Sequence, residues 1–154
     1  MSLSQTPEFK NIAEKLIEKF PIAFGHIDID KVLFLKETEK TPKKYADVRS
    51  IKEPYTFMTE YKFIIRFYEQ VMAGMTDAQK TMTVYHELLH IDPDFTKIKK
   101  HNIEDFRELV SKYGVNWDID PNLPNILDND EDGPKQEDLT SDDALAEEDE
   151  PEIL

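Results

Sequence analysis

The residues best suited to chemistry in this chain are His86, Glu87 and His90, which form the pattern His-Glu-x-x-His. Residues four apart lie on the same face of an α-helix, about one turn from each other. Both imidazoles can therefore bind one cation, and zinc accepts nitrogen ligands at roughly 2.0–2.1 Å. Glu87 lies next to that face, where its carboxylate can take a proton from a zinc-bound water. The spacing predicts one zinc ion per chain in a site of the peptidase type.

The sequence around this pattern favours a single helix from Thr76 to Ile91. Thr76 or Asp77 is a suitable N-cap, and Pro93 prevents the helix from running much further. The alternative is that the two histidines are ordinary helix residues and that Glu87 is a solvated charge. In that case the chain is a metal-free regulatory protein that happens to contain this pattern.

A zinc peptidase needs three protein ligands and leaves the fourth position to water. The chain has four histidines and no cysteine, which excludes thiolate sites, cysteine nucleophiles and disulfides. The third ligand must come from the other histidines or from an acid. We favour His101, because a polar link after His90 can turn the chain back and a helix predicted at 102–113 would hold it. The alternatives are His26, Glu104 and Asp105.

The run from Tyr85 to Phe106, with HELLH, a short polar link and then a histidine, resembles the phage metallopeptidase family. More distantly it is similar to the SprT-like and WLM-type zinc peptidases. The resemblance covers roughly residues 7–117 and implies a minimal zincin-like fold. It implies His86, His90 and His101 as zinc ligands and Glu87 as the general base. The chain lacks the metzincin continuation, since positions 93 and 96 are Pro and Thr.

Charge is distributed unevenly along the 154 residues. Residues 1–117 contain 18 basic and 18 acidic side chains, whereas 118–154 contain 15 acids and one lysine, Lys135. Such a segment cannot bury enough apolar surface to offset its ordering entropy. We therefore expect a zincin-like metallopeptidase domain at 1–117 and an acidic, mostly disordered tail at 118–154. The tail is a solubilising segment, an interaction segment for a basic protein partner, or an autoinhibitory strand in the cleft.

Composition also excludes some classes of function. No apolar run is long enough to span a membrane and no signal peptide is recognisable, so we expect a cytoplasmic protein without a membrane partner. Direct nucleic-acid binding is not expected, because the tail is anionic and the domain has no net positive charge. The expected partner is a protein or peptide substrate.

The predicted fold is α+β, with an N-terminal helix, a small mixed or antiparallel sheet, the HExxH helix and a C-terminal helix. Residues 7–20 have apolar side chains at helical spacing, and strands are expected at 23–29, 32–36, 45–51 and 61–69. The last strand is assigned the edge that pairs with an extended substrate. His26, Asp28 and Asp30 would share one face of the first strand, either as a polar face above a core lined by Ile27 and Ile29 or as a further metal contact. Candidates for the oxyanion donor are Tyr55, Tyr61, Arg66 and Tyr113.

These patterns predict a zinc-dependent metallopeptidase that hydrolyses peptide bonds by a zinc-activated water, with Glu87 as general base. The alternative is a non-catalytic zinc-binding module of zincin-like fold that binds a protein partner through its acidic tail.

Overall fold

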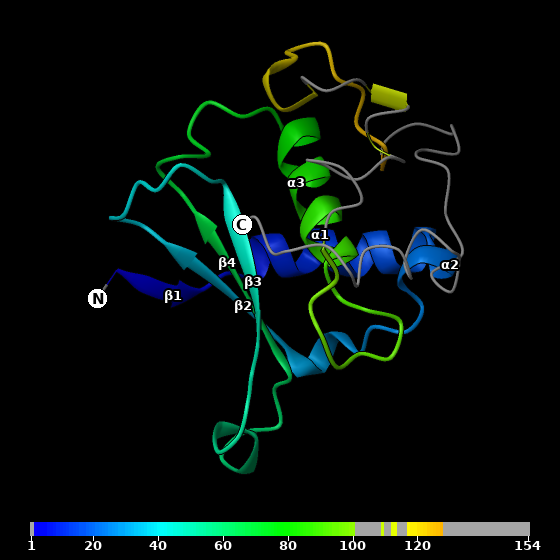
Figure 1. Ribbon diagram of the computed structural model, residues 1–154. Coiled ribbons are helices and arrows are strands. Elements are labelled where there is room, and N and C mark those ends of the chain that lie inside the picture. The colour runs from blue at the N-terminus through cyan, green and yellow to red at the C-terminus, as the bar shows by residue number, and fades with distance from the viewer. Residues whose placement is uncertain (1, 101–108, 110–111, 114–116, 128–154) are drawn as a thin grey trace.

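The computed structural model describes residues 2–100, 109, 112–113 and 117–127, and these form an α+β fold (Figure 1). No helix among them is both long and apolar enough to cross a membrane. The helices are α1 (Pro7–Lys19), α2 (Pro21–Phe24) and α3 (Asp77–Leu89). The strands are β1 (Leu3–Gln5), β2 (Val32–Glu37), β3 (Ala46–Ser50) and β4 (Phe63–Tyr68). Short 3-10 turns are η1 (Ile29–Lys31), η2 (Tyr55–Phe57) and η3 (Trp117–Ile119).

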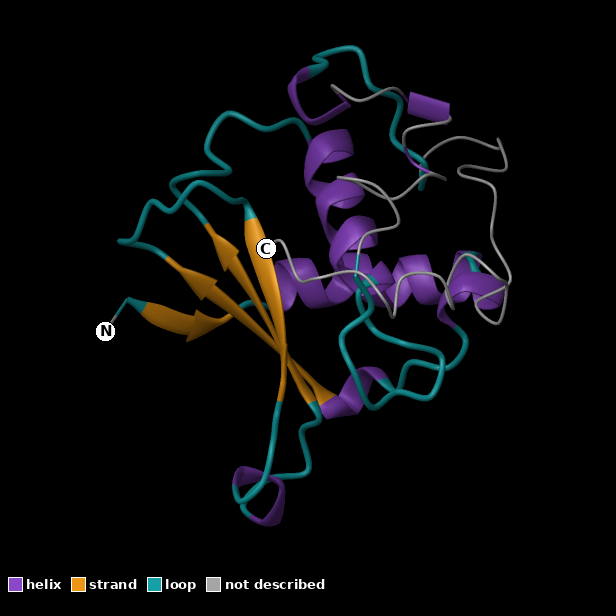
Figure 2. Ribbon diagram, in the orientation of Figure 1, coloured by secondary structure: helices purple, strands orange, loops and turns teal. Residues whose placement is uncertain are grey.

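The four strands form one mixed sheet in the order β1-β2-β4-β3 (Figure 2). β2 and β4 are parallel, whereas β1 and β3 are antiparallel to their neighbours. The fold class, the first helix and the strands expected at 32–36, 45–51 and 61–69 are confirmed. The C-terminal helix expected at 102–113 lies mostly outside the described residues. β1 was not predicted from the sequence.

Strand β4 has hydrogen-bonded neighbours on both sides. Its Ile65 is opposite Phe34 of β2 and opposite Val48 of β3. The expectation that residues 61–69 offer a free edge for substrate is therefore wrong. Among the described residues, the edge strand on this side of the sheet is β3, because β3 is the last strand in the order.

The strand expected at 23–29 is also wrong, because this segment is a short helix followed by turns. Pro21 begins α2 at a position where proline is well tolerated. The amide of Gly25 donates to the carbonyl of Pro21 at 2.8 Å, and a Cβ on Gly25 would lie 2.5 Å from that oxygen. Asp28 then accepts from the amide of Asp30 and caps η1. The chain is thus coiled here.

Helices α1 and α3 cover one face of the sheet (Figure 1). Every second side chain of β4, beginning with Phe63, is buried and points toward these helices, as the period of two requires. Phe67 stacks on Phe9 of α1 with ring centroids 4.2 Å apart. Tyr85 of α3 is fully buried and meets the rings of Phe20 and Phe24 edge-on. This packing fixes the position and rotation of α3.

Residues 117–127 pack against α3. Trp117, Leu123 and Ile126 are buried in the core, and η3 contacts α3. The side-chain amide of Gln79 donates to the carbonyl of Asp120 at 3.0 Å. The segment that directly follows the predicted domain end at 117 therefore belongs to the packed structure. Residues 128–154 lie outside the described part, and the division of the chain stays a prediction.

Candidate metal centre

Helix α3 begins at a complete capping box. The hydroxyl of Thr76 accepts from the amide of Gln79 at 3.1 Å, and the side chain of Gln79 accepts from the amide of Thr76 at 2.9 Å. Thr76 is thus the N-cap, one of the two residues expected. The helix ends at Leu89, and His90 is its C-cap with helical backbone angles. The one-turn relation between His86 and His90 therefore holds in the structure.

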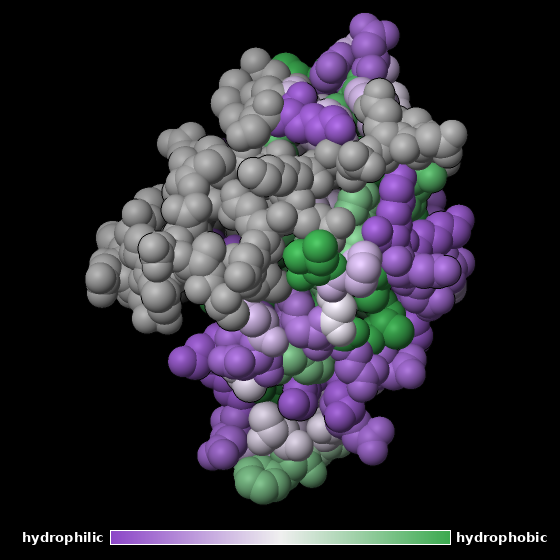
Figure 3. All heavy atoms as spheres, turned by 90° about the vertical axis from the view of Figure 1, so that its right-hand side faces the viewer, coloured by the Kyte–Doolittle hydropathy of each residue, from purple (hydrophilic) through white to green (hydrophobic). Residues whose placement is uncertain are grey.

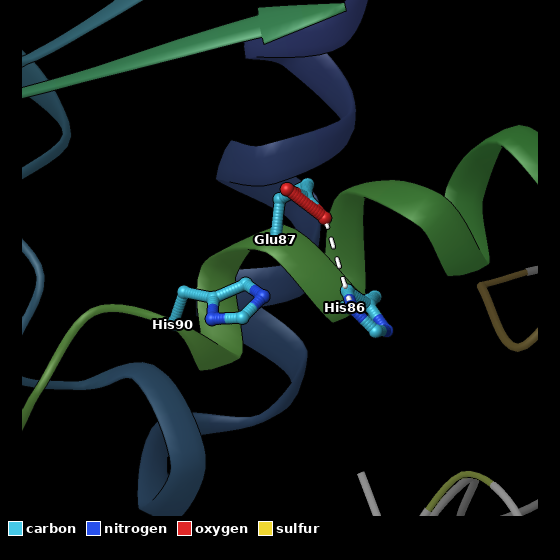
Figure 4. Close-up of side chains that lie close together, drawn as sticks. All are labelled: His86, Glu87 and His90. Atoms are coloured by element: carbon cyan, nitrogen blue, oxygen red, sulfur yellow. Dashed lines mark ion pairs between the residues drawn. The ribbon is translucent and has the colours of Figure 1, made fainter. Parts of the chain in front are cut away.

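His86, Glu87 and His90 come together at the end of α3 (Figure 4). One ligand atom from each lies within 4.8 Å of the others. Glu87 and His90 are buried, and His86 is partly buried. The Nε2 atom of His86 lies 3.8 Å from Oε2 of Glu87, and the two imidazole centroids are 5.3 Å apart. Among the described residues, no other group of acids and histidines is placed to hold a metal ion.

The ring of His90 is oriented by the chain that follows it. Its Nδ1 lies 2.7 Å from the carbonyl oxygen of Lys99. Because a carbonyl only accepts, Nδ1 carries the proton and Nε2 keeps its lone pair. A ligating histidine in metalloproteins commonly donates its second nitrogen to a carbonyl in this way. His90 is thus held in the tautomer that a metal ligand needs.

This contact depends on the link after α3, which turns back as the sequence predicted. Ile98 pairs with Ile91 in an antiparallel bridge, and the amide of Lys99 donates to the carbonyl of His90. Asp92 closes the turn by accepting from the amides of Thr96 and Lys97. The Lys99 carbonyl is a main-chain group, so no side-chain pattern in the sequence pointed to it.

Trp117 lies next to His86, with ring centroids 6.3 Å apart. It is the single tryptophan of the chain and is buried. No local pattern places it at the site, because 31 residues separate it from His86 and the contact depends on how η3 packs on α3.

His26 lies close to the centre but is not one of the three clustered residues. Its Nε2 lies 3.1 Å from the carbonyl oxygen of Ile91. Burial lowers the pKa of His26, against the raising effects of that hydrogen bond and of Asp92. Asp28 and Asp30 are exposed; Asp28 caps η1 and Asp30 lies within it. The structure does not bring these three side chains together in a group that could hold a metal ion.

The predicted third ligand, His101, lies outside the described residues, as do Glu104 and Asp105. The position of Arg66 excludes it as a donor to the oxyanion. Arg66 lies on the face of β4 opposite Ile65 and Phe67, where it donates to Asp47 at 2.9 Å. It therefore points away from α3.

The donor set suits a divalent metal ion. Imidazole nitrogens are ligands for zinc and other late transition metals, and a nearby carboxylate adds compensating charge. The buried position of Glu87 and His90 and the fixed tautomer of His90 agree with such a site. A metal ion is the cofactor that these residues fit.

Comparison with known proteins gives one family. Neither a curated protein nor a solved structure matches the chain significantly. A family model described as "Putative phage metallopeptidase" matches residues 1–125, which include all of α3 and the link after it. The more distant likeness to SprT-like and WLM-type peptidases is not shown by this match. Since the matched residues cover most of the chain, the protein belongs to the phage metallopeptidase family.

Proposed function

We propose that the protein is a zinc-dependent peptidase in which His86, His90 and His101 hold the metal and Glu87 is the general base. The observation that carries the proposal is the clustering of His86, Glu87 and His90, with the tautomer of His90 set by Lys99. Family membership supports the same chemistry. When bound, zinc supplies Lewis acidity and lowers the pKa of a coordinated water to about 7.

The position of Lys99 supports His101 as the third ligand. The Lys99 carbonyl is hydrogen-bonded to His90, so the chain passes the metal centre just before His101. Two residues span at most about 7.6 Å between Cα atoms. His101 follows Lys99 by two residues in the sequence, which is why we prefer it to His26, whose Nε2 is bonded to the carbonyl of Ile91.

Glu87 performs the proton transfers in this proposal. Its carboxylate takes a proton from the attacking water and later gives it to the leaving amine. Burial of Glu87 keeps bulk water from competing for the proton, and His86 at 3.8 Å keeps the carboxylate beside the metal ligands.

The substrate would lie along β3. An extended peptide can add to a sheet by pairing with a free strand edge. β3 has that edge and contacts α3, whereas β4 is enclosed. We therefore move the substrate-binding role from residues 61–69 to Ala46–Ser50.

The test is Glu87→Gln, which keeps the shape of the side chain but removes its basicity. Hydrolysis of a fluorescently labelled unfolded protein should fall by about 10²–10⁴, while the zinc content stays that of wild type. Glu69→Gln is the matched control, because Glu69 is half exposed and pairs with Lys36 at 3.2 Å. Unchanged turnover in Glu87→Gln would remove Glu87 from the mechanism. If wild type and Glu87→Gln both contain zinc and neither cleaves the substrate, the non-catalytic zinc-binding module is favoured.

A further inference from the structure

A groove separates the free edge of β3 from the link after α3. It has a volume of about 560 Å³ and is open to solvent. One wall is formed by Val48–Lys52 and the other by Thr96–Ile98. The second wall leads directly to Lys99, whose carbonyl is bonded to His90. The second wall of the groove thus ends one residue before the carbonyl that orients His90.

The β3 wall offers backbone hydrogen bonds. The carbonyl of Tyr45 accepts from Tyr68 and the amide of Ile51 donates to Lys62, so the odd-numbered residues of this strand bond to β4. In an antiparallel pair the intervening residues direct their backbone groups the other way. Val48 and Ser50 therefore present an amide and a carbonyl each to the groove.

The groove is also cationic. Arg49, Lys52 and Lys97 line it and are exposed. None of the three forms an ion pair in the part of the chain that the structure describes. Three apolar residues, Val48, Ile51 and Ile98, also line the groove. The fitting occupant is an extended segment that is acidic and carries a few aliphatic residues.

The chain contains such a segment after Leu127. Residues 128–154 include 13 acids and one lysine. Between Pro134 and Pro151 lie 16 residues without proline, so every amide there can donate to a strand. Leu139 and Leu145 occur among the acids of this stretch.

Reach does not limit the contact. The 27 residues after Leu127 can span roughly 90 Å when extended, whereas a domain of this size has a radius of gyration of about 14 Å. A tethered segment also has an effective concentration on the order of millimolar. Even if the groove binds peptides weakly, a segment of the same chain can thus occupy it in competition with a free peptide.

We propose that the acidic segment 135–150 docks as an added strand in the groove between β3 and Thr96–Ile98. Its backbone pairs with Val48 and Ser50, and its carboxylates lie against Arg49, Lys52 and Lys97. The docking itself does not depend on peptidase activity. Under the proposed function, which this consequence rests on, the segment occupies the substrate edge and a substrate must displace it.

Zero-length cross-linking of the full-length protein tests this contact. A water-soluble carbodiimide joins a carboxylate to a lysine amine with no spacer, and mass spectrometry of the digest identifies the pairs. At low salt, carboxylates of 135–150 should couple within one chain to Lys52 and Lys97. In 1 M NaCl, where the Debye length is about 3 Å, the yield should fall about tenfold or more.

Two variants keep both lysines available while changing the charge. Arg49→Glu should lower the coupling at Lys52 and Lys97 severalfold, and Lys15→Glu on the exposed face of α1 should not. Replacing Glu147, Glu148, Asp149 and Glu150 by their amides should lower it as well. Coupling spread evenly over exposed lysines such as Lys15 and Lys43 would overturn the proposal. So would indifference to Arg49→Glu, or coupling only between two chains.

Discussion

Gln79 connects the start of the metal-bearing helix to the segment that carries Trp117. Its side chain is 5% exposed and makes two hydrogen bonds in opposite senses. The oxygen accepts from the amide of Thr76 at 2.9 Å, and the nitrogen donates to the carbonyl of Asp120 at 3.0 Å. Different substitutions at this one position can therefore distinguish the contribution of the α3 cap to stability from that of the contact with residues 117–127.

Gln79→Ala removes both hydrogen bonds and leaves the amide of Thr76 and the carbonyl of Asp120 without this partner. A typical hydrogen bond contributes about 1 kcal/mol, and a buried group left unsatisfied costs about 1–3 kcal/mol, so the loss should be about 2–4 kcal/mol. Gln79→Glu keeps the acceptor for Thr76 but puts a carboxylate against the Asp120 carbonyl. Its cost should be about 1–2 kcal/mol, because an acid in the first turn partly offsets the lost bond.

Urea unfolding followed by circular dichroism gives these free energies of unfolding. Thr76→Ala is the matched control, since it removes the other half of the cap at a cost of about 1 kcal/mol and leaves the Asp120 bond in place. Emission of the single tryptophan should shift to longer wavelength in Gln79→Glu and not in Thr76→Ala. A Gln79→Glu protein as stable as wild type, with unchanged emission, would refute the attachment.

Two further predictions concern the metal and the sheet. Zinc at 100 times its dissociation constant should raise the melting temperature of wild type by about 5–11 °C in a thermal scan. His86→Ala should abolish this shift. His26→Ala should keep it, because His26 is outside the cluster. Burial would raise the pKa of Asp47, but hydrogen bonds from Arg66, Lys44 and Tyr68 outweigh it and lower that pKa. The charged carboxylate therefore stabilises the fold above the ordinary pKa of 3.8, and this contribution is lost as the pH falls below that value. Asp47→Asn should flatten that part of the acid unfolding curve measured by circular dichroism, and an unchanged curve would contradict the assignment.

Local patterns predicted the elements that carry the site. The capping residue and apolar spacing predicted α3 within two residues of its ends, and alternation predicted β4. The prediction of a strand at 23–29 was wrong. Its isoleucines alternate with polar residues, as in a strand, but Pro21 and Gly25 favour a compact turn. In this segment the turn residues outweighed the alternation.

The features that the sequence did not reveal are contacts between distant residues. Strand order places β3 outside β4, although β3 precedes β4 in the chain, so the substrate edge was assigned to the wrong strand. The partner of His90 Nδ1 is a backbone carbonyl, which any residue at position 99 would supply. Trp117 reaches His86 only through the packing of η3 on α3. Such contacts follow from tertiary packing rather than from local spacing.

The most direct test of the metal centre is the zinc content per chain, measured by elemental analysis on protein purified without added metal. Wild type, His90→Ala and His101→Ala should be compared, with circular dichroism to show that each is folded. We expect close to one zinc ion per chain in wild type and a clear loss in both variants. A folded wild type that contains no zinc and takes up none when it is added would contradict it.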